Sequence, residues 1–123
     1  MKHIETKCVQ EGYQPKNGEP RVLPIYQSTT FKYDSADTLG QLFDLQAEGF
    51  FYSRLANPTV AAVEEKIAAL EGGVGAMMTS SGQAAVLTSI FNICRAGDHV
   101  IRTSTIYGGT YNLLNKTMRE MGI

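Results

Sequence analysis

Ser81, Gly82 and Gln83 form a segment whose residue types could bind a phosphate group. They follow a short apolar run and precede a helix-forming stretch. At such a junction, free backbone N–H groups and the positive end of a helix point at one spot. The small side chains let an anion approach the backbone closely. An ordinary serine N-cap without any ligand would show the same residues.

Two other segments could complete such a site. Tyr52, Ser53 and Arg54 lie upstream, and in an extended segment the phenol and the guanidinium would face the same side. Tyr107 precedes the pair 108–109, two glycines that permit a tight turn, so its ring could stack on a planar ligand. The alternatives are a surface arginine beside a packed tyrosine, and an ordinary loop tyrosine.

The elements that would position these residues begin at Asn57, a good N-cap followed by a proline suited to the first helical position. This predicts a helix that ends at the glycine pair 72–73. Further on, the pattern predicts short buried strands at 75–79 and 99–103, and helices at 83–95 and 110–121, closed by glycines 97 and 122.

Alternating strands and helices of these lengths favour an α/β fold with a parallel sheet. In such sheets ligands bind beyond the carboxyl ends of the strands, where residues 80–83 and 104–109 fall. These two segments are therefore expected to form one site. Two strands are too few for a sheet covered on both faces, so we expect a fragment or a fold completed by other chains.

The N-terminal residues 1–56 contain many glycines, prolines and aromatic residues and show little helical order. Such a segment cannot bury its own aromatic surface well. We expect an extended arm that lies across the rest of the chain or across a partner subunit.

Composition excludes several classes of protein. Hydrophobic residues make up 43% and charged residues 19%, and the net charge of −1 provides no electrostatic footprint for nucleic acid or an anionic membrane. No apolar run approaches membrane-spanning length, and the N-terminus lacks the apolar core of a signal peptide. The cysteines at positions 8 and 94 have no metal-ligand spacing, and Cys94 is expected to fill a core. A reduced, cytoplasmic protein without nucleic-acid or membrane partners is predicted.

Four ordered motifs, at 21–30, 52–59, 80–84 and 107–110, closely resemble the pyridoxal-phosphate enzymes of cysteine and methionine metabolism. The resemblance covers nearly the whole chain. It implies the N-terminal part of a type I fold, in which an extended arm precedes the start of a mostly parallel sheet flanked by helices. Residues 1–56 would be the arm that contacts a neighbouring subunit, and 57–123 the incomplete first part of the cofactor domain.

The resemblance also implies roles for individual residues, with pyridoxal 5'-phosphate as cofactor. Tyr52 and Arg54 would bind the cofactor phosphate in a neighbouring subunit's site, within a homodimer or homotetramer. Gly82 and Gln83 would give backbone N–H groups to the same phosphate. Tyr107 would stack on the pyridine ring near an amino-acid substrate and assist acid–base steps. The neighbouring Ser53 and Ser81 are included in the cofactor site.

Within the family, the run 108–111 is most similar to that of O-acetylhomoserine sulfhydrylases, whereas methionine γ-lyases commonly carry a cysteine where Gly109 stands. The implied reaction replaces the acetate of O-acetyl-L-homoserine with sulfide, giving L-homocysteine. Cystathionine γ-synthase, cystathionine γ-lyase and methionine γ-lyase activities remain alternatives, as does a non-catalytic, truncated interaction module. The family's Schiff-base lysine, in an S-x-x-K pattern, is absent, so the chain alone is expected to be inactive.

Overall fold

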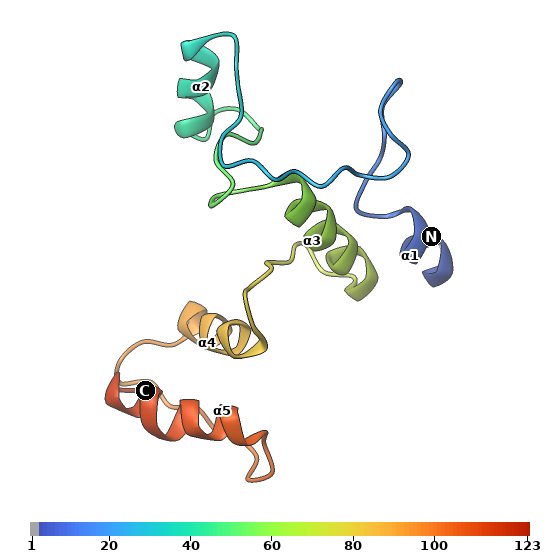
Figure 1. The fold of residues 1–123 in the computed structure, drawn as a ribbon. Coiled ribbons are helices and arrows are strands. Elements are labelled where there is room, and N and C mark those ends of the chain that lie inside the picture. The colour runs from blue at the N-terminus through green and yellow to red at the C-terminus, as the bar shows by residue number, and fades with distance from the viewer. Residues whose placement is uncertain (1–2) are drawn as a thin grey trace. The chain divides into compact units, whose positions relative to one another are not determined.

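The computed structural model describes residues 3–123, which divide into two compact units between Met78 and Thr79. The first unit holds helices α1, α2 and α3, and the second holds α4 and α5, with the π-helix η1 continuing α5 (Figure 1). Helix α3 belongs to the first unit because it packs with the N-terminal segment, and the expected arm at 1–56 and cofactor domain at 57–123 stay predictions.

Helix α3 spans Pro58–Glu71 and has the ends that the sequence predicts. The Asn57 side chain accepts a hydrogen bond from the backbone N–H of Thr59 at 2.9 Å, which satisfies one of the free donors of the first turn. At the other end Gly72 has φ 69°, the left-handed conformation that glycine adopts without a steric penalty. The predicted helix is confirmed.

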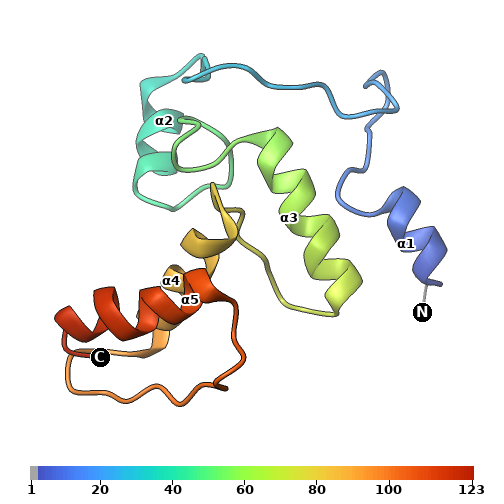
Figure 2. The same ribbon diagram turned by 60° about the horizontal axis from the view of Figure 1, so that its bottom comes forward.

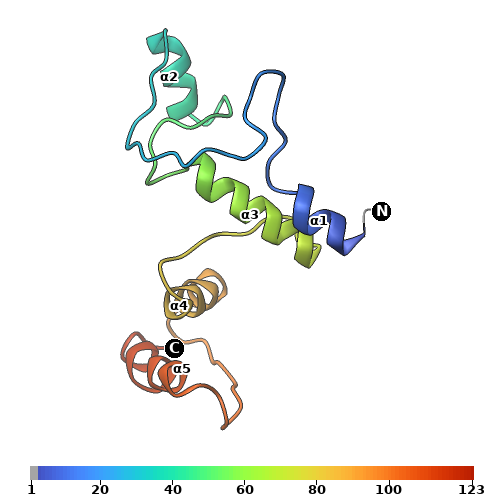
Figure 3. The ribbon, with the colours of Figure 1, turned by 45° about the vertical axis from the view of Figure 1, so that its right-hand side comes forward.

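Helix α1, Ile4–Gln10, was not expected from the sequence and lies beside α3 (Figures 2 and 3). Lys7 Nζ donates to the carbonyl oxygen of Ala69 at 2.7 Å, and Lys66 Nζ donates to that of Cys8 at 3.1 Å. Both carbonyls belong to the last turn of a helix, where intrahelical partners are missing. Each lysine therefore satisfies the C-terminal end of the other helix.

Helix α2, Ala36–Phe43, is also absent from the sequence prediction. Ser35 caps it by accepting a hydrogen bond from the backbone N–H of Asp37 at 3.1 Å. Its Leu42 is 2% exposed and packs against Gly49, in the segment that follows the helix. The N-terminal segment is thus partly helical, and its most extended part runs between α1 and α2.

The second unit consists of α4, Gly82–Ile93, and a continuous helix formed by α5, Gly108–Asn112, and η1, Leu113–Met118. Both helices lie close to the predicted ranges, although α4 ends earlier. Cys94, expected on the apolar side of this helix, is instead its half-buried C-cap residue. Met118 is completely buried between the elements of this unit. The backbone N–H of Gly97 donates to the carbonyl of Gly122 at 2.7 Å, which ties the two helix ends together.

The two strands predicted at 75–79 and 99–103 do not form within residues 3–123. Met77, Met78 and Ile101, which lie in these runs, are well exposed rather than buried. The only pairing across this described range is an isolated antiparallel bridge between Thr30 and Tyr52. A strand needs a neighbour that satisfies its N–H and C=O groups, and no described segment forms backbone pairing with either run. The parallel sheet expected from the sequence is therefore not observed.

The chain buries little of its own apolar surface. Its accessible surface is 9759 Å², whereas a compact protein of 13.4 kDa exposes roughly 6,500 Å². Two separately folded units of these sizes would together expose about 7,800 Å². Among the described residues only Leu42 and Met118 are buried hydrophobic side chains. The exposed apolar runs are thus surfaces suited to packing against further protein.

None of the helices between residues 3 and 123 has the length and apolar character needed to cross a membrane.

Candidate functional site

The N-terminus of α4 has the free donors that an anion site requires. Ser81 is its N-cap, and the Ser81 Oγ accepts a hydrogen bond from the backbone N–H of Ala84 at 3.1 Å. The next donor, Ala85 N, reaches the Ser81 carbonyl at 3.0 Å. Across residues 3–123, the N–H groups of Gly82 and Gln83 have no partner, and open space surrounds the position of a Gly82 side chain. These groups can bind a phosphate oxygen.

The first turn of α5 lies against the start of α4. Gln83 Nε2 donates to Thr110 Oγ1 at 3.3 Å, across 27 residues of sequence. Thr110 is 7% exposed, and Gln83 Oε1 is buried without a partner among the residues that the structure describes. Within the second unit the structure thus places Gln83 beside Gly109 and Thr110, whereas the prediction that 80–83 and 104–109 form one ligand site stays a prediction. The sequence did not predict the contact made by the Gln83 side chain, because a contact between residues 27 positions apart leaves no local pattern.

Tyr107 packs over Gly109. A Cβ atom built at Gly109 would lie 2.6 Å from Tyr107 Cε1 and 2.7 Å from Gln83 Nε2, so a side chain at this position would require the tyrosine ring and the glutamine amide to shift. The Tyr107 side chain is 74% exposed and makes no hydrogen bond with any described residue. Its ring therefore keeps a free face that can stack on a planar group.

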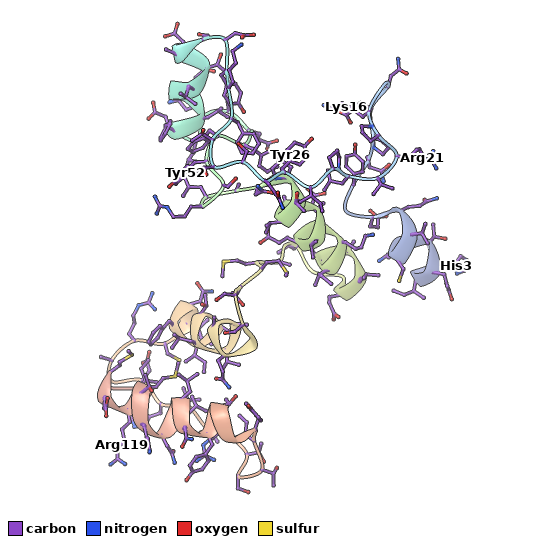
Figure 4. All side chains as sticks on the ribbon, viewed as in Figure 1. His3, Lys16, Arg21, Tyr26, Tyr52 and Arg119 are labelled. Atoms are coloured by element: carbon purple, nitrogen blue, oxygen red, sulfur yellow. The ribbon has the colours of Figure 1, made fainter. Side chains whose placement is uncertain are left out.

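Tyr52 and Arg54 also come together, although the local conformation differs from the prediction. The segment forms a turn instead of continuing extended, because Leu55 N and Ala56 N donate to the Tyr52 carbonyl at 2.9 and 3.1 Å. Arg54 Cζ lies 5.2 Å from the centroid of the Tyr52 ring, a cation–π contact. The phenol and the exposed guanidinium can still bind one anion. Figure 4 shows Tyr52 in the segment between α2 and α3.

Ser53 is held by its own chain. Its hydroxyl donates to the carbonyl of Ser28 and accepts a hydrogen bond from Asn57 Nδ2 at 2.9 Å. Its backbone N–H donates to the Thr29 carbonyl at 2.9 Å. The same Asn57 amide donates to the Tyr26 carbonyl at 3.0 Å. These contacts anchor the turn that carries Tyr52 and Arg54 to the start of α3. The cap role of Asn57 was predicted from sequence, but this anchoring role was not.

The predicted site residues fall into two groups, each coherent within its own unit. Tyr52, Ser53 and Arg54 belong to the first unit. The second unit carries the other group, Ser81, Gly82, Gln83 and Tyr107. No group of His, Cys, Asp or Glu side chains within residues 3–123 has the arrangement of a metal site.

Comparison with known proteins assigns the chain to an enzyme class. Residues 5–123 match the Cys/Met metabolism PLP-dependent enzyme family, and the chain belongs to this family. An O-acetyl-L-homoserine sulfhydrylase of Corynebacterium glutamicum is 48% identical over 121 residues, 98% of this chain and 28% of that protein. An L-methionine gamma-lyase of Treponema denticola is 47% identical over 100 residues, 81% of this chain and 25% of that protein.

A solved structure supports the same assignment. It is that of a candidate O-acetylhomoserine (thiol)-lyase from Campylobacter jejuni, with a TM-score of 0.91 and 33% identity over 100% of this chain and 30% of that one. That protein carries N'-pyridoxyl-lysine-5'-monophosphate at its position 205. The chain therefore has the fold of part of a type I PLP-dependent enzyme, and it spans less than a third of the length of these relatives.

The residues of the second unit fit pyridoxal 5'-phosphate, the cofactor of this family. The free N–H groups of Gly82 and Gln83 suit its phosphate, because helix N-termini stabilise anions. The exposed Tyr107 ring suits its planar pyridine ring. The unpartnered, buried oxygen of Gln83 is consistent with a site that a ligand completes.

Proposed function

We propose that this chain is part of an O-acetylhomoserine sulfhydrylase. This enzyme replaces the acetate of O-acetyl-L-homoserine with sulfide and forms L-homocysteine. The Corynebacterium glutamicum relative bears this activity in its name, and so does a second relative from Leptospira meyeri, 42% identical over 120 residues. The enzyme's substrate is then a small amino-acid derivative.

The observation that carries this choice is the crowding at Gly109. Any side chain there would meet the ring of Tyr107 and the amide of Gln83 within 3 Å. Methionine γ-lyases commonly carry a cysteine at the corresponding position. In this chain a cysteine there would displace both side chains, whereas glycine leaves them in place, which favours the sulfhydrylase. The Treponema denticola relative keeps methionine γ-lyase as the second candidate.

When bound, the cofactor supplies an electron sink for carbanions on the substrate. In this proposal the backbone N–H groups of Gly82 and Gln83 hold its phosphate, and the Ser81 hydroxyl caps the helix that presents them. Tyr107 orients the ring and moves a proton at its phenol oxygen. Tyr52 and Arg54 bind the phosphate in a neighbouring subunit of a homodimer or homotetramer, supported by Ser53. Residues 1–56 would then be the arm that reaches this subunit, and 57–123 the beginning of the cofactor domain.

The reaction is tested on the full-length enzyme that contains this chain. Purified enzyme with cofactor is given O-acetyl-L-homoserine and sulfide, and separately L-methionine or cystathionine. Homocysteine is quantified by chromatography after thiol labelling, and 2-oxobutyrate by a coupled dehydrogenase. Homocysteine as the dominant product supports the proposal. Faster release of 2-oxobutyrate from methionine or cystathionine would assign a lyase instead.

The 123-residue chain by itself is expected to form no homocysteine above the rate without enzyme. None of its serines is followed three positions later by a lysine, and its apolar surface is largely uncovered. The measurement is the same assay on the soluble chain at matched concentration. Turnover at the rate of the full-length enzyme would show that these residues contain the whole catalytic site.

Changing Gly109 to alanine in the full-length enzyme is expected to lower kcat/KM for O-acetyl-L-homoserine about tenfold. The added methyl group must displace the ring of Tyr107 or the Gln83 amide, because both lie within 3 Å of it. Gly108→Ala is the matched control, since its methyl group meets open space. Steady-state kinetics of the two variants make the comparison. Equal effects at both positions would refute the role given to Gly109.

A further inference from the structure

The side chain of Gln83 has a position that its proposed backbone role does not require. The cofactor phosphate would need only the N–H group, which any residue other than proline supplies. The amide instead extends to the first turn of α5, where Nε2 donates to Thr110 Oγ1 at 3.3 Å. Thr110 is 7% exposed, so this hydrogen bond is shielded from water.

One polar atom of the Gln83 amide is left without a partner. Oε1 is buried and makes no hydrogen bond within residues 3–123. Rotating the amide by half a turn would not change this, because the single Thr110 hydroxyl can pair with either end but not with both. A buried unpaired polar atom costs free energy. A methionine would fill similar space without that cost, so the amide needs another explanation.

The neighbouring ring of Tyr107 indicates a role for the amide end that donates to Thr110. Its side chain is 74% exposed and forms no hydrogen bond with a described residue, so only packing fixes its orientation. Tyr107 Cε1 and Gln83 Nε2 lie 2.6 and 2.7 Å from the same point, the position of a Cβ on Gly109. The ring and the amide are therefore neighbours above this glycine. The amide, held by Thr110, therefore lies on one side of a ring that no hydrogen bond to a described residue fixes.

We propose that the side chain of Gln83 is a positioning residue that sets the orientation of the Tyr107 ring. Thr110 is a second positioning residue, because its hydroxyl holds the Gln83 amide in place. The consequence for turnover rests on the proposed function, whereas the effect on the ring does not. The effect on the orientation of the ring and the effect on turnover can therefore be tested independently.

The first test observes the ring directly in the full-length protein without cofactor. 3-Fluorotyrosine is placed at position 107, and its 19F spectrum is recorded for the parent and for Gln83→Met and Thr110→Val. A changed chemical shift or a broadened line is expected for both variants, and no further change when they are combined. Gln46→Met and Thr88→Val are the matched controls, since both residues are exposed and their side chains make no hydrogen bond among the described residues. Unchanged spectra in both test variants would overturn the proposal.

The second test measures turnover with cofactor and the substrate that the full-length enzyme uses. Gln83→Met keeps the backbone N–H, so we expect kcat to fall about fivefold, the worth of one neutral hydrogen bond. KM is expected to change less than twofold. Thr110→Ser keeps the hydroxyl and is expected to restore both kcat and the parent 19F spectrum, which a loss of packing alone would not allow. If the enzyme proves to be a lyase, the proposed function fails while the spectra still decide the role of Gln83.

Discussion

Replacing Arg54 with alanine in the full-length enzyme is expected to weaken the binding of pyridoxal 5'-phosphate about 100-fold. The guanidinium is exposed and already held over the Tyr52 ring, with Cζ 5.2 Å from the ring centroid. It can therefore pair with a phosphate at little cost in side-chain entropy. Loss of two charge-assisted hydrogen bonds accounts for an effect of this size. The measurement is a titration of the apoenzyme with cofactor, followed by absorbance.

Three further variants show whether the effect belongs to the phosphate contact. Arg54→Lys keeps the charge but loses the forked geometry, so an intermediate affinity is expected. Tyr52→Phe keeps the ring under the guanidinium and removes one hydroxyl, which should cost about fivefold. Arg119→Ala is the matched control, because Arg119 lies on the last helix, on the side away from α4 (Figure 4), and its side chain makes no hydrogen bond with a described residue. An affinity of Arg54→Ala within twofold of the parent would contradict the assignment.

Local signals in the sequence predicted the helices with well-formed ends. Asn57, Pro58 and Gly72 fix the bounds of α3 through capping and backbone conformation, which depend on a few neighbouring residues. Helix α1 was missed because it has seven residues, no side-chain cap and two stabilising lysine contacts with α3 that the sequence does not reveal. Helix α2 was missed because it has only eight residues and lies in a segment rich in glycine, proline and aromatic residues, and the cap at Ser35 was not recognised.

The predicted strands, unlike the helices, depend on more than local sequence. The apolar runs at 75–79 and 99–103 have strand-like composition, but a strand forms only when a neighbour satisfies its backbone groups. Within residues 3–123 neither run has such a neighbour, so both are exposed. The family assignment is consistent with this result, because the chain spans less than a third of its relatives' length. The composition of these segments therefore predicted that they are able to form strands. It did not predict their conformation in this chain.

The candidate site was predictable as a set of segments but not as a set of contacts. The motifs at 52–54, 80–83 and 107–110 contain the residues that we expect to bind a phosphate and a planar ring. The bond between Gln83 and Thr110 joins residues 27 positions apart, and its existence depends on how α4 and α5 pack. The conformation of the Tyr52–Arg54 turn likewise depends on Asn57 and on the segment at 26–29, whose contacts leave no periodic pattern.

Replacing Asn57 with alanine is expected to lower the free energy of unfolding of the full-length protein by about 2–4 kcal/mol. Asn57 is 8% exposed, and its amide accepts from Thr59 N and donates to the Tyr26 carbonyl and to Ser53 Oγ. Alanine removes the cap of α3 and leaves these groups without their partner. In Figure 4, Tyr26 lies near the first turn of α3, which is the region that the loss of these hydrogen bonds would destabilise. Unfolding in urea, followed by circular dichroism, measures the difference.

Two other variants test whether the stability comes from the capping of α3 by Asn57 or from the hydrogen bonds of Asn57 to Tyr26 and Ser53. Asn57→Ser keeps an oxygen that can cap the helix but cannot reach Tyr26 and Ser53, so a loss of about half the alanine effect is expected. Asn92→Ala removes an exposed asparagine of α4 without a side-chain hydrogen bond in the described chain, and should change stability by less than about 0.5 kcal/mol. Because Asn57 anchors the turn that carries Tyr52 and Arg54, the alanine variant should also bind cofactor more weakly at temperatures where it remains folded. Normal cofactor affinity together with the lost stability would show that this turn holds its conformation without the asparagine.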